Sequence, residues 1–201
     1  MHIEKGWWPG DTKDEIAIGA VLVQNTNWSN AEKALGNLRR NDMLSMDALA
    51  NATLVEIETH IRPSGVYKRK AGCLKELAAY FLSVGGIDGC ARIQTWRIRR
   101  ELLRIHGIGN ETADAILLYA LGKPVFVVDA YTIRIIGRVT GRASEDYAAI
   151  QKEAHAASNG DPEVYMRMHA FFVELAKAHC RKVPRCTGCP VFDICGYPEK
   201  S

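Results

Sequence analysis

A short glycine-containing turn between two helical stretches is the feature that most constrains the fold of this chain. The turn reads His-Gly-Ile-Gly-Asn at residues 106–110. A tight connection between two helices needs backbone angles that glycine adopts more readily than other residues. The turn also leaves the first N–H groups of the second helix pointing outward, where they suit an anion such as a phosphate. The sequence therefore predicts a helix-hairpin-helix with an anion site at Gly107, Ile108, Gly109 and Asn110.

Almost all of the remaining chain is predicted to be helical. Thr12, Ser29 and Thr53 are each followed three residues later by glutamate, the pattern of a capping box. An Asp-Pro pair at residues 161–162 predicts the start of a long helix. The strand-like run at residues 124–128 is too short and solitary for a sheet, so we expect a buried connector. We predict an all-α fold, with helices over residues 14–24, 30–40, 54–61, 66–84, 93–105, 111–121, 130–139, 142–159 and 161–180.

Composition limits the class of protein only loosely. The chain has 201 residues, enough for one sizeable domain or two small lobes, and 47% of them are hydrophobic. No run reaches the roughly 18 apolar residues of a membrane span. The first residues lack a signal-peptide pattern, so we expect a cytoplasmic protein associated with the nucleoid. The net charge is only +3, but basic residues gather locally, at residues 68–70, 97–104, 134–142 and 177–185.

A lone carboxylate, Asp129, follows the glycine turn by about twenty residues, at the start of the helix predicted over residues 130–139. The helix dipole favours the ionised form of an acid at this position. Such a residue can be a plain N-cap. It can also be a fixed charge that stabilises positive charge developing in a transition state. The residues alone leave both interpretations open.

The turn and the carboxylate together resemble the endonuclease III superfamily of helix-hairpin-helix DNA glycosylases. The matching segments are residues 105–109 and 128–130. The resemblance implies a six-helix barrel domain over residues 14–123 and a second helical domain made of residues 1–13 and 124–201, with the active site in the cleft between them. It also implies a monomer that binds double-stranded DNA containing a damaged base and no membrane. Asp129 would then stabilise the sugar and orient water while the N-glycosidic bond is hydrolysed.

Glu111, just after the turn, discriminates most between members of this superfamily. Bifunctional members have a lysine there, which forms a Schiff base and then cleaves the strand. Glutamate cannot form an imine, so we predict a monofunctional glycosylase without AP-lyase activity; whether Lys70 or Lys123 reaches the sugar is left open. The helix dipole alone also favours an acid in this turn. Beside polyanionic DNA, however, an acid suits a cationic base such as an N-alkylated purine.

Two further segments resemble the parts of these enzymes that enter DNA when a base is flipped out. Gln24, within Leu-Val-Gln-Asn-Thr, matches the glutamine that fills the hole left by the flipped nucleotide. Val66, followed by Tyr67 and Lys68, matches the loop that wedges into the opposite strand. The alternatives are that Gln24 only ends its helix and that Val66 and Tyr67 belong to the core.

Tryptophans suggest a base pocket. Trp7 and Trp8 precede a proline, and Trp28 follows the Gln24 segment. Aromatic faces stack on bases and attract cations. This set, with Glu111, resembles the 3-methyladenine DNA glycosylase III group within the superfamily, which implies that the base stacks between Trp7 or Trp8 and Trp28. The alternative is that the tryptophans pin the N-terminal segment to the first lobe.

Four cysteines gather near the C-terminus, with gaps of five, two and five residues. Disulfides are disfavoured without an export signal, and zinc usually takes two Cys-x-x-Cys pairs whereas one is present. A [4Fe–4S] cluster therefore fits better than zinc. The related glycosylases carry gaps of six, two and five, so the first gap here is one residue shorter. The predicted ligands are Cys180, Cys186, Cys189 and Cys195.

We therefore predict a base-excision-repair DNA glycosylase that removes alkylated purines, 3-methyladenine first. One alternative is an endonuclease III-like enzyme for oxidised pyrimidines or mismatched bases, because pocket shape cannot be predicted from these residues. Another is a non-catalytic protein that binds lesions through the hairpin. A pure binder has no need of Asp129, so the carboxylate discriminates between the enzyme and the binder.

Overall fold

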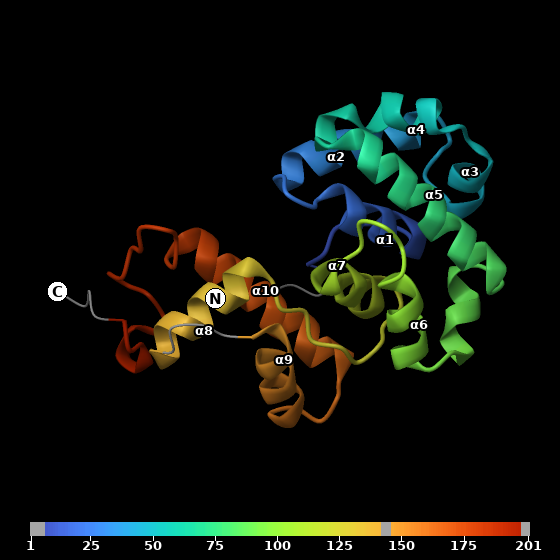
Figure 1. Cartoon of the computed structure of the whole chain (residues 1–201). Helices are drawn as coiled ribbons and strands as arrows, with labels where there is room; N and C mark the ends of the chain where they lie inside the picture. The colour runs from blue at the N-terminus through green and yellow to red at the C-terminus, as the bar shows by residue number, and fades with distance from the viewer. Residues whose placement is uncertain (1–6, 142–145, 198–201) are drawn as a thin grey trace. The chain divides into compact units, whose positions relative to one another are not determined.

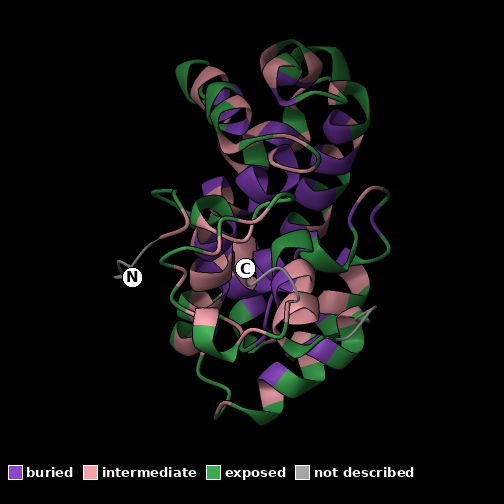
Figure 2. Ribbon diagram, turned by 90° about the vertical axis from the view of Figure 1, so that its left-hand side faces the viewer, coloured by how far each residue is buried: buried purple, intermediate pink, exposed green. Residues whose placement is uncertain are grey.

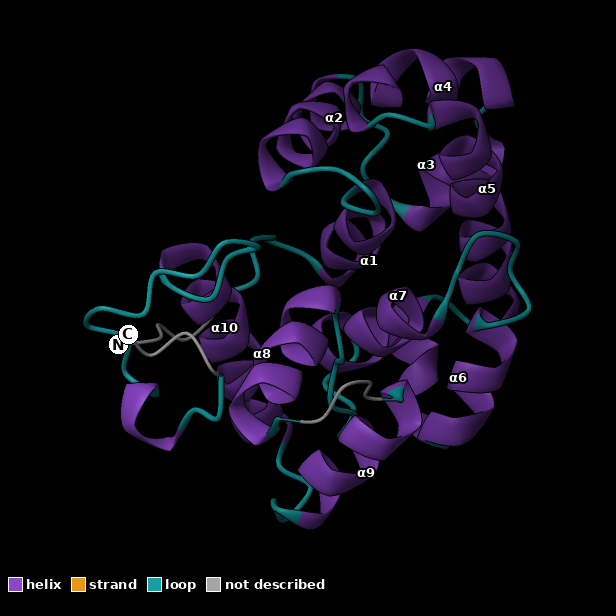
Figure 3. Cartoon of the chain, turned by 60° about the vertical axis from the view of Figure 1, so that its left-hand side comes forward, coloured by secondary structure: helices purple, strands orange, loops and turns teal. Residues whose placement is uncertain are grey.

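The computed structural model describes residues 7–141 and 146–197, and this part of the chain consists of helices, turns and loops (Figures 1 and 3). The prediction of an all-α fold is confirmed. No helix in the described part is long and apolar enough to cross a membrane. The elements are α1 (Lys13–Leu22), α2 (Trp28–Arg40), α3 (Met46–Asn51), α4 (Leu54–Ile61), η1 (Arg62–Ser64), α5 (Tyr67–Ser83), η2 (Ile87–Arg92), α6 (Thr95–Leu102), α7 (Asn110–Ala115), η3 (Ile116–Ala120), α8 (Ala130–Thr140), α9 (Tyr147–Ala156), α10 (Pro162–Ala178) and η4 (Phe192–Ile194).

The chain divides into two compact units. One consists of Trp8–Lys123, and the other of Met1–Trp7 together with Pro124–Ser201. We call them the hairpin unit and the carboxylate unit, after Gly107 and Asp129. The sequence-based division differs from this one in assigning residues 8–13 to the second domain.

In the hairpin unit, α5 is the central packing element. It contacts α3 and α4, while α1 packs on α2, α5, α7 and η3 (Figure 1). The core of the unit consists mainly of buried apolar residues; Figure 2 shows the buried residues in purple. Ile18, Leu74 and Phe81 are wholly removed from solvent. Burying such side chains contributes roughly 1.5–3 kcal/mol each to folding, which is why these short helices are stable together.

The helix starts test the capping predictions. Thr12 and Thr53 cap α1 and α4 as predicted, and Thr53 forms a full capping box with Glu56. The prediction for Ser29 is wrong, because Asn27 caps α2 through a bond from the Asn30 amide. Asn27 is an equally good cap and lies two residues earlier. The short helix α3, missed by the sequence analysis, is too brief to show a clear apolar period.

In the carboxylate unit, α8 packs against α10. The run 124–128 is a connector without regular secondary structure, as predicted; residues 125–128 are buried and Pro124 is exposed. Side chains of α9 pair with both backbone groups of Phe126 in this connector: the Phe126 amide donates to His155 Nε2 (3.0 Å), and Gln151 Nε2 donates to the Phe126 carbonyl (2.7 Å). The backbone of Phe126 therefore needs no strand partner. The predicted start of α9 at residues 142–144 lies outside the described residues.

Candidate functional site

The predicted hairpin lies between α6 and α7 in the hairpin unit. Gly107 has a φ of +96°, a left-handed conformation that strains residues with side chains. Gly109 is the N-cap residue of α7, and within the described residues no side chain caps this helix. The side chain of Ile108 is buried, so only its backbone can face a ligand. The first turn of α7 is thus a suitable site for an anion.

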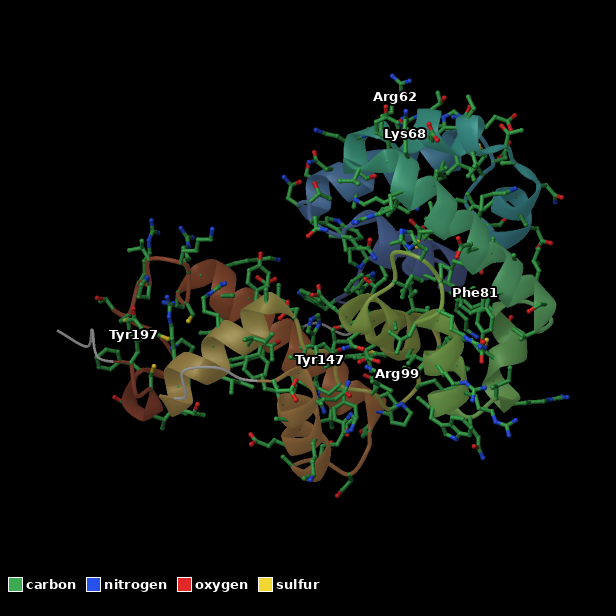
Figure 4. All side chains as sticks on the ribbon, viewed as in Figure 1. Arg62, Lys68, Phe81, Arg99, Tyr147 and Tyr197 are labelled. Atoms are coloured by element: carbon green, nitrogen blue, oxygen red, sulfur yellow. The ribbon has the colours of Figure 1, made fainter. Side chains whose placement is uncertain are left out.

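An ion pair braces the two helices of the hairpin. Arg99 on α6 donates from Nε and Nη2 to the two carboxylate oxygens of Asp114 on α7, at 2.7 and 3.1 Å. Asp114 is completely buried. Arg99 Nη2 also donates to Asn110 Oδ1 at 3.1 Å (Arg99 is labelled in Figure 4). A bidentate pair of this kind fixes orientation as well as distance, so it holds the first residue of α7 in place.

Gln24 belongs to the same site. It follows α1, and its Nε2 donates to the Gly107 carbonyl (2.9 Å) and to Thr112 Oγ1 (2.8 Å). The structure therefore brings the predicted plug residue together with the predicted hairpin, 83 residues away along the chain. The side chain is half-buried, and it does more than end its helix.

The predicted wedge lies at the start of α5. Val66 is 57% exposed, which excludes a core role, and its φ of +46° places a β-branched residue in the left-handed region. Such a conformation costs on the order of 1–3 kcal/mol and is typical of functional segments. Tyr67 is half-buried beneath the guanidinium of Arg62, at 5.5 Å, and Lys68 is exposed (Arg62 and Lys68 are labelled in Figure 4).

An aromatic cluster is formed by Trp8, Trp28 and Tyr119. The Trp8 and Trp28 rings meet edge to face at 6.1 Å, and Trp8 lies over Tyr119 at 4.7 Å. Tyr119 belongs to η3, a single π-helical turn marked by the bond from the Leu121 amide to the Ile116 carbonyl (3.2 Å). Sequence reasoning missed Tyr119, because a π turn shifts the register of an α-helical pattern.

Trp7 has different neighbours from Trp8. It belongs to the carboxylate unit, where its ring meets that of His169 edge-on at 5.9 Å. Its Nε1 donates to Glu174 Oε1 at 3.3 Å. The structure thus assigns the two adjacent tryptophans to different units. Glu111, the other predicted residue near the base, is exposed in the first turn of α7.

Asp129 is the N-cap residue of α8. Its Oδ1 accepts hydrogen bonds from the Thr132 amide and hydroxyl, both at 2.7 Å. Its Oδ2 lies 3.7 Å from His169 Nε2. Burial raises the pKa of Asp129, but His169 and the Thr132 bonds outweigh that effect and hold the pKa below its usual value. One oxygen thus stabilises the helix while the carboxylate stays charged, so the N-cap role does not exclude a catalytic role.

His169 is the second functional candidate that sequence reasoning missed. It is buried in the middle of α10, between Trp7 and Asp129. The only signal in the sequence is a histidine on the apolar face of a predicted helix, which is more often a satisfied core residue. Its pairing with Asp129, 40 positions earlier, becomes visible only once α8 packs on α10.

The structure brings the four C-terminal cysteines to one pocket. Cys180, Cys186, Cys189 and Cys195 all line it, together with apolar residues of α8 and α10. Cys180 Sγ accepts a hydrogen bond from Arg138 Nη1 at 3.3 Å. Within the described residues, no group of three or more His, Cys, Asp or Glu is close enough to hold a single metal ion. Four thiols around one pocket are a donor set that suits an iron–sulfur cluster.

Arg138 on α8 also fastens the backbone of this cysteine loop. It donates to the carbonyls of Arg181 (2.6 Å) and Lys182 (2.9 Å). Arg134, one turn earlier, donates to the Cys180 carbonyl at 2.9 Å. The loop is therefore attached to the helix that Asp129 begins, and it carries the exposed basic residues Arg181, Lys182 and Arg185.

Comparison with known proteins agrees with this geometry. Residues 18–158 match the model of the HhH-GPD superfamily base excision DNA repair proteins. A Methanocaldococcus jannaschii protein, provisionally named a DNA repair glycosylase, is 39% identical over 95% of this chain and 89% of its own length. A thymine-DNA glycosylase of Aeropyrum pernix is 31% identical over 90% of this chain and 81% of its own. The solved structure of the H. pylori 3-methyladenine DNA glycosylase bound to 1,N6-ethenoadenine is 32% identical with a TM-score of 0.73, over 85% of this chain and 87% of that one.

The chain therefore belongs to the HhH-GPD superfamily and is a base excision repair DNA glycosylase. DNA is its partner, which accounts for a hairpin built to present backbone amides to an anion.

Proposed function

We propose that this protein removes alkylated purines from double-stranded DNA, with 3-methyladenine as its first substrate. The observation that carries the proposal is the aromatic cluster of Trp8, Trp28 and Tyr119. Ring faces stack on a flipped base and attract the positive charge that N-alkylation gives a purine. The similarity to the H. pylori enzyme, named a 3-methyladenine DNA glycosylase, supports the same substrate class.

Asp129 would supply the chemistry. When the glycosidic bond breaks, the base leaves with the bonding electron pair and an alkylated purine becomes neutral. Positive charge develops on the deoxyribose, and a fixed carboxylate stabilises it. Water then bonds to the sugar carbon and releases one proton to the solvent. The lowered pKa of Asp129 keeps the group ionised for this role at neutral pH. An alkylated base is already a good leaving group, so one carboxylate suffices.

The lysines support hydrolysis without a Schiff base. Glu111 stands where bifunctional members have a lysine. Lys123 Nζ donates to the carbonyls of Ala91 and Ile93, at 3.1 and 3.0 Å. Burial and then Arg69 lower the pKa of Lys70 to about 8, which would favour a nucleophilic amine. Lys70, however, is only 1% exposed and binds two backbone carbonyls. We therefore propose a monofunctional enzyme.

We also propose that the four cysteines hold a [4Fe–4S] cluster. Their shared pocket and the Arg138 bond to Cys180 Sγ suit thiolate ligands. Bound there, the cluster would stabilise the cysteine loop, whose basic residues would contact DNA phosphates. Purified protein should be brown, with about four iron and four sulfide per chain. Colourless protein that binds zinc instead would overturn the assignment.

A panel of lesions tests the function. Methylated DNA should release 3-methyladenine, and duplexes with an alkylated purine should break only after alkali. Borohydride should trap no covalent complex. Thymine opposite guanine and oxidised pyrimidines form the other arms of the panel. Faster excision of mismatched thymine would overturn the proposed substrate class; thymine is the base in the name of the A. pernix relative. Gel filtration of the same protein should give a monomer.

A further inference from the structure

A buried ammonium group joins the two segments that resemble DNA-inserting parts. Lys70 on α5 is 1% exposed. Its Nζ donates to the Leu22 carbonyl (2.8 Å) and to the Ser64 carbonyl (2.6 Å). Leu22 is the last residue of α1, two residues before Gln24, and Ser64 is the last residue of η1, two residues before Val66. One side chain therefore holds the ends of both helices.

This arrangement is costly, which argues that it has a purpose beyond filling the core. Burying a charged amine carries a large desolvation penalty, and a well-packed apolar side chain often gives equal stability in such a place. The carbonyls at the two helix ends would otherwise lack partners within their helices. Ser64 is itself buried and donates from Oγ to the Ile61 carbonyl at 2.7 Å, so the base of the Val66 loop is fixed at two points.

The residues that follow the two helix ends held by Lys70 are exposed or have a strained backbone. Val66 stands in solvent with a left-handed backbone, and Asn25, next to Gln24, also has a positive φ of 53°. Conformations of this kind persist only when their surroundings determine them firmly. Lys70 binds a residue that shortly precedes each of these segments.

We propose that Lys70 is a positioning residue that holds the Gln24 and Val66 segments at a fixed separation, so that they enter the two strands of a DNA duplex together. The proposal rests on the proposed function in that the protein acts on duplex DNA, and on the resemblance of both segments to the parts of related enzymes that enter DNA. It does not depend on which damaged base is removed. Lys70 itself touches neither the DNA nor the reacting sugar.

The same helix offers a matched control. Lys75 Nζ also donates to two backbone carbonyls, those of Ala50 (2.7 Å) and Ala52 (2.6 Å) at the end of α3. Neither carbonyl belongs to the segments around Gln24 or Val66. Lys70→Met and Lys75→Met therefore remove the same kind of group from the same helix. Only the first change releases the two inserting segments.

The experiment uses the full chain and a duplex in which 2-aminopurine lies opposite a tetrahydrofuran abasic site. Insertion unstacks the 2-aminopurine and raises its fluorescence. For Lys70→Met we expect the fraction of inserted complex to fall about tenfold, while DNA binding through the hairpin persists. Lys75→Met should keep the wild-type signal. In a Gln24→Ala/Val66→Gly background, the Lys70 change should have no further effect, because the segments it positions no longer act.

The outcomes separate this inference from the proposed function. Equal signals from the two lysine variants, high or low, would overturn the positioning role. A wild-type protein that excises methylpurines without raising the fluorescence would also overturn it, while leaving the proposed function intact. A fluorescence rise without excision of methylpurines would overturn the proposed function and leave the positioning role of Lys70 intact. If Lys70→Met does not fold, Lys70→Gln, which keeps two shorter N–H donors, replaces it with the same expected order of signals.

Discussion

The hairpin around Gly107 and the carboxylate site around Asp129 show two ways of building a functional site. The hairpin is braced by the Arg99–Asp114 pair, whose members are 15 residues apart in one contiguous motif. Asp129 instead depends on His169, which comes from another helix 40 positions later. A local motif carries its own geometry, whereas the lowered pKa of the carboxylate depends in part on a histidine brought to it by tertiary packing. The two sites should therefore respond differently to mutation.

The largest effect on stability is expected in the hairpin. Arg99→Leu leaves the fully buried Asp114 carboxylate without its bidentate partner. Breaking a buried pair in this way costs about 3–5 kcal/mol. Urea unfolding monitored by circular dichroism measures the loss. The double change Arg99→Leu/Asp114→Leu should be more stable than Arg99→Leu alone, and a double variant that is less stable would contradict the bracing role.

The next expected effect is on base recognition by the aromatic cluster of Trp8, Trp28 and Tyr119. Trp28→Ala removes a stacking face, and we expect a loss of about 1–3 kcal/mol in recognition of the alkylated base. Single-turnover release of 3-methyladenine from methylated DNA measures it. Trp96→Ala is the control, because Trp96 on α6 is an exposed tryptophan outside the cluster. Equal losses of activity in both variants would show that the aromatic cluster does not form the base pocket.

The next prediction concerns the pKa of Asp129. His169 is one of the interactions that lower the pKa of Asp129, so His169→Gln should raise that pKa. A lowered pKa stabilises the folded state above the unfolded value, and this contribution is lost as pH falls through the folded value. Carbon-13 NMR of the Asp129 carboxyl group follows the titration. His60→Gln, in α4 of the hairpin unit, should leave it unchanged.

A smaller effect on stability than that of Arg99→Leu should come from the two bonds between Gln24 and the hairpin. Gln24→Ala removes two hydrogen bonds, to Gly107 and Thr112, each contributing about 0.5–1.5 kcal/mol to stability. Thermal unfolding measures this modest loss. A drop as large as that of Arg99→Leu would show that Gln24, rather than the ion pair, determines the hairpin geometry.

These contrasts explain what the sequence could predict. Gly107 predicts its turn because a φ of +96° suits glycine. Asp129 predicts a helix start because an N-cap depends on interactions with residues next to it in the sequence. His169, Tyr119 and Lys70 carry no such local signal. Their roles come from contacts between elements far apart along the chain. The missed α3 and the wrong cap at Ser29 have local causes instead: a short helix and a competing Asn27.

We propose that the Asp129 carboxylate catalyses hydrolysis, while the hairpin binds DNA independently of it. Release of 3-methyladenine and DNA affinity, measured together for wild type and Asp129→Asn, test this most directly. We predict that the variant loses about 100- to 1000-fold in the rate of base release and binds DNA at least as tightly. Undiminished base release by Asp129→Asn would contradict the account.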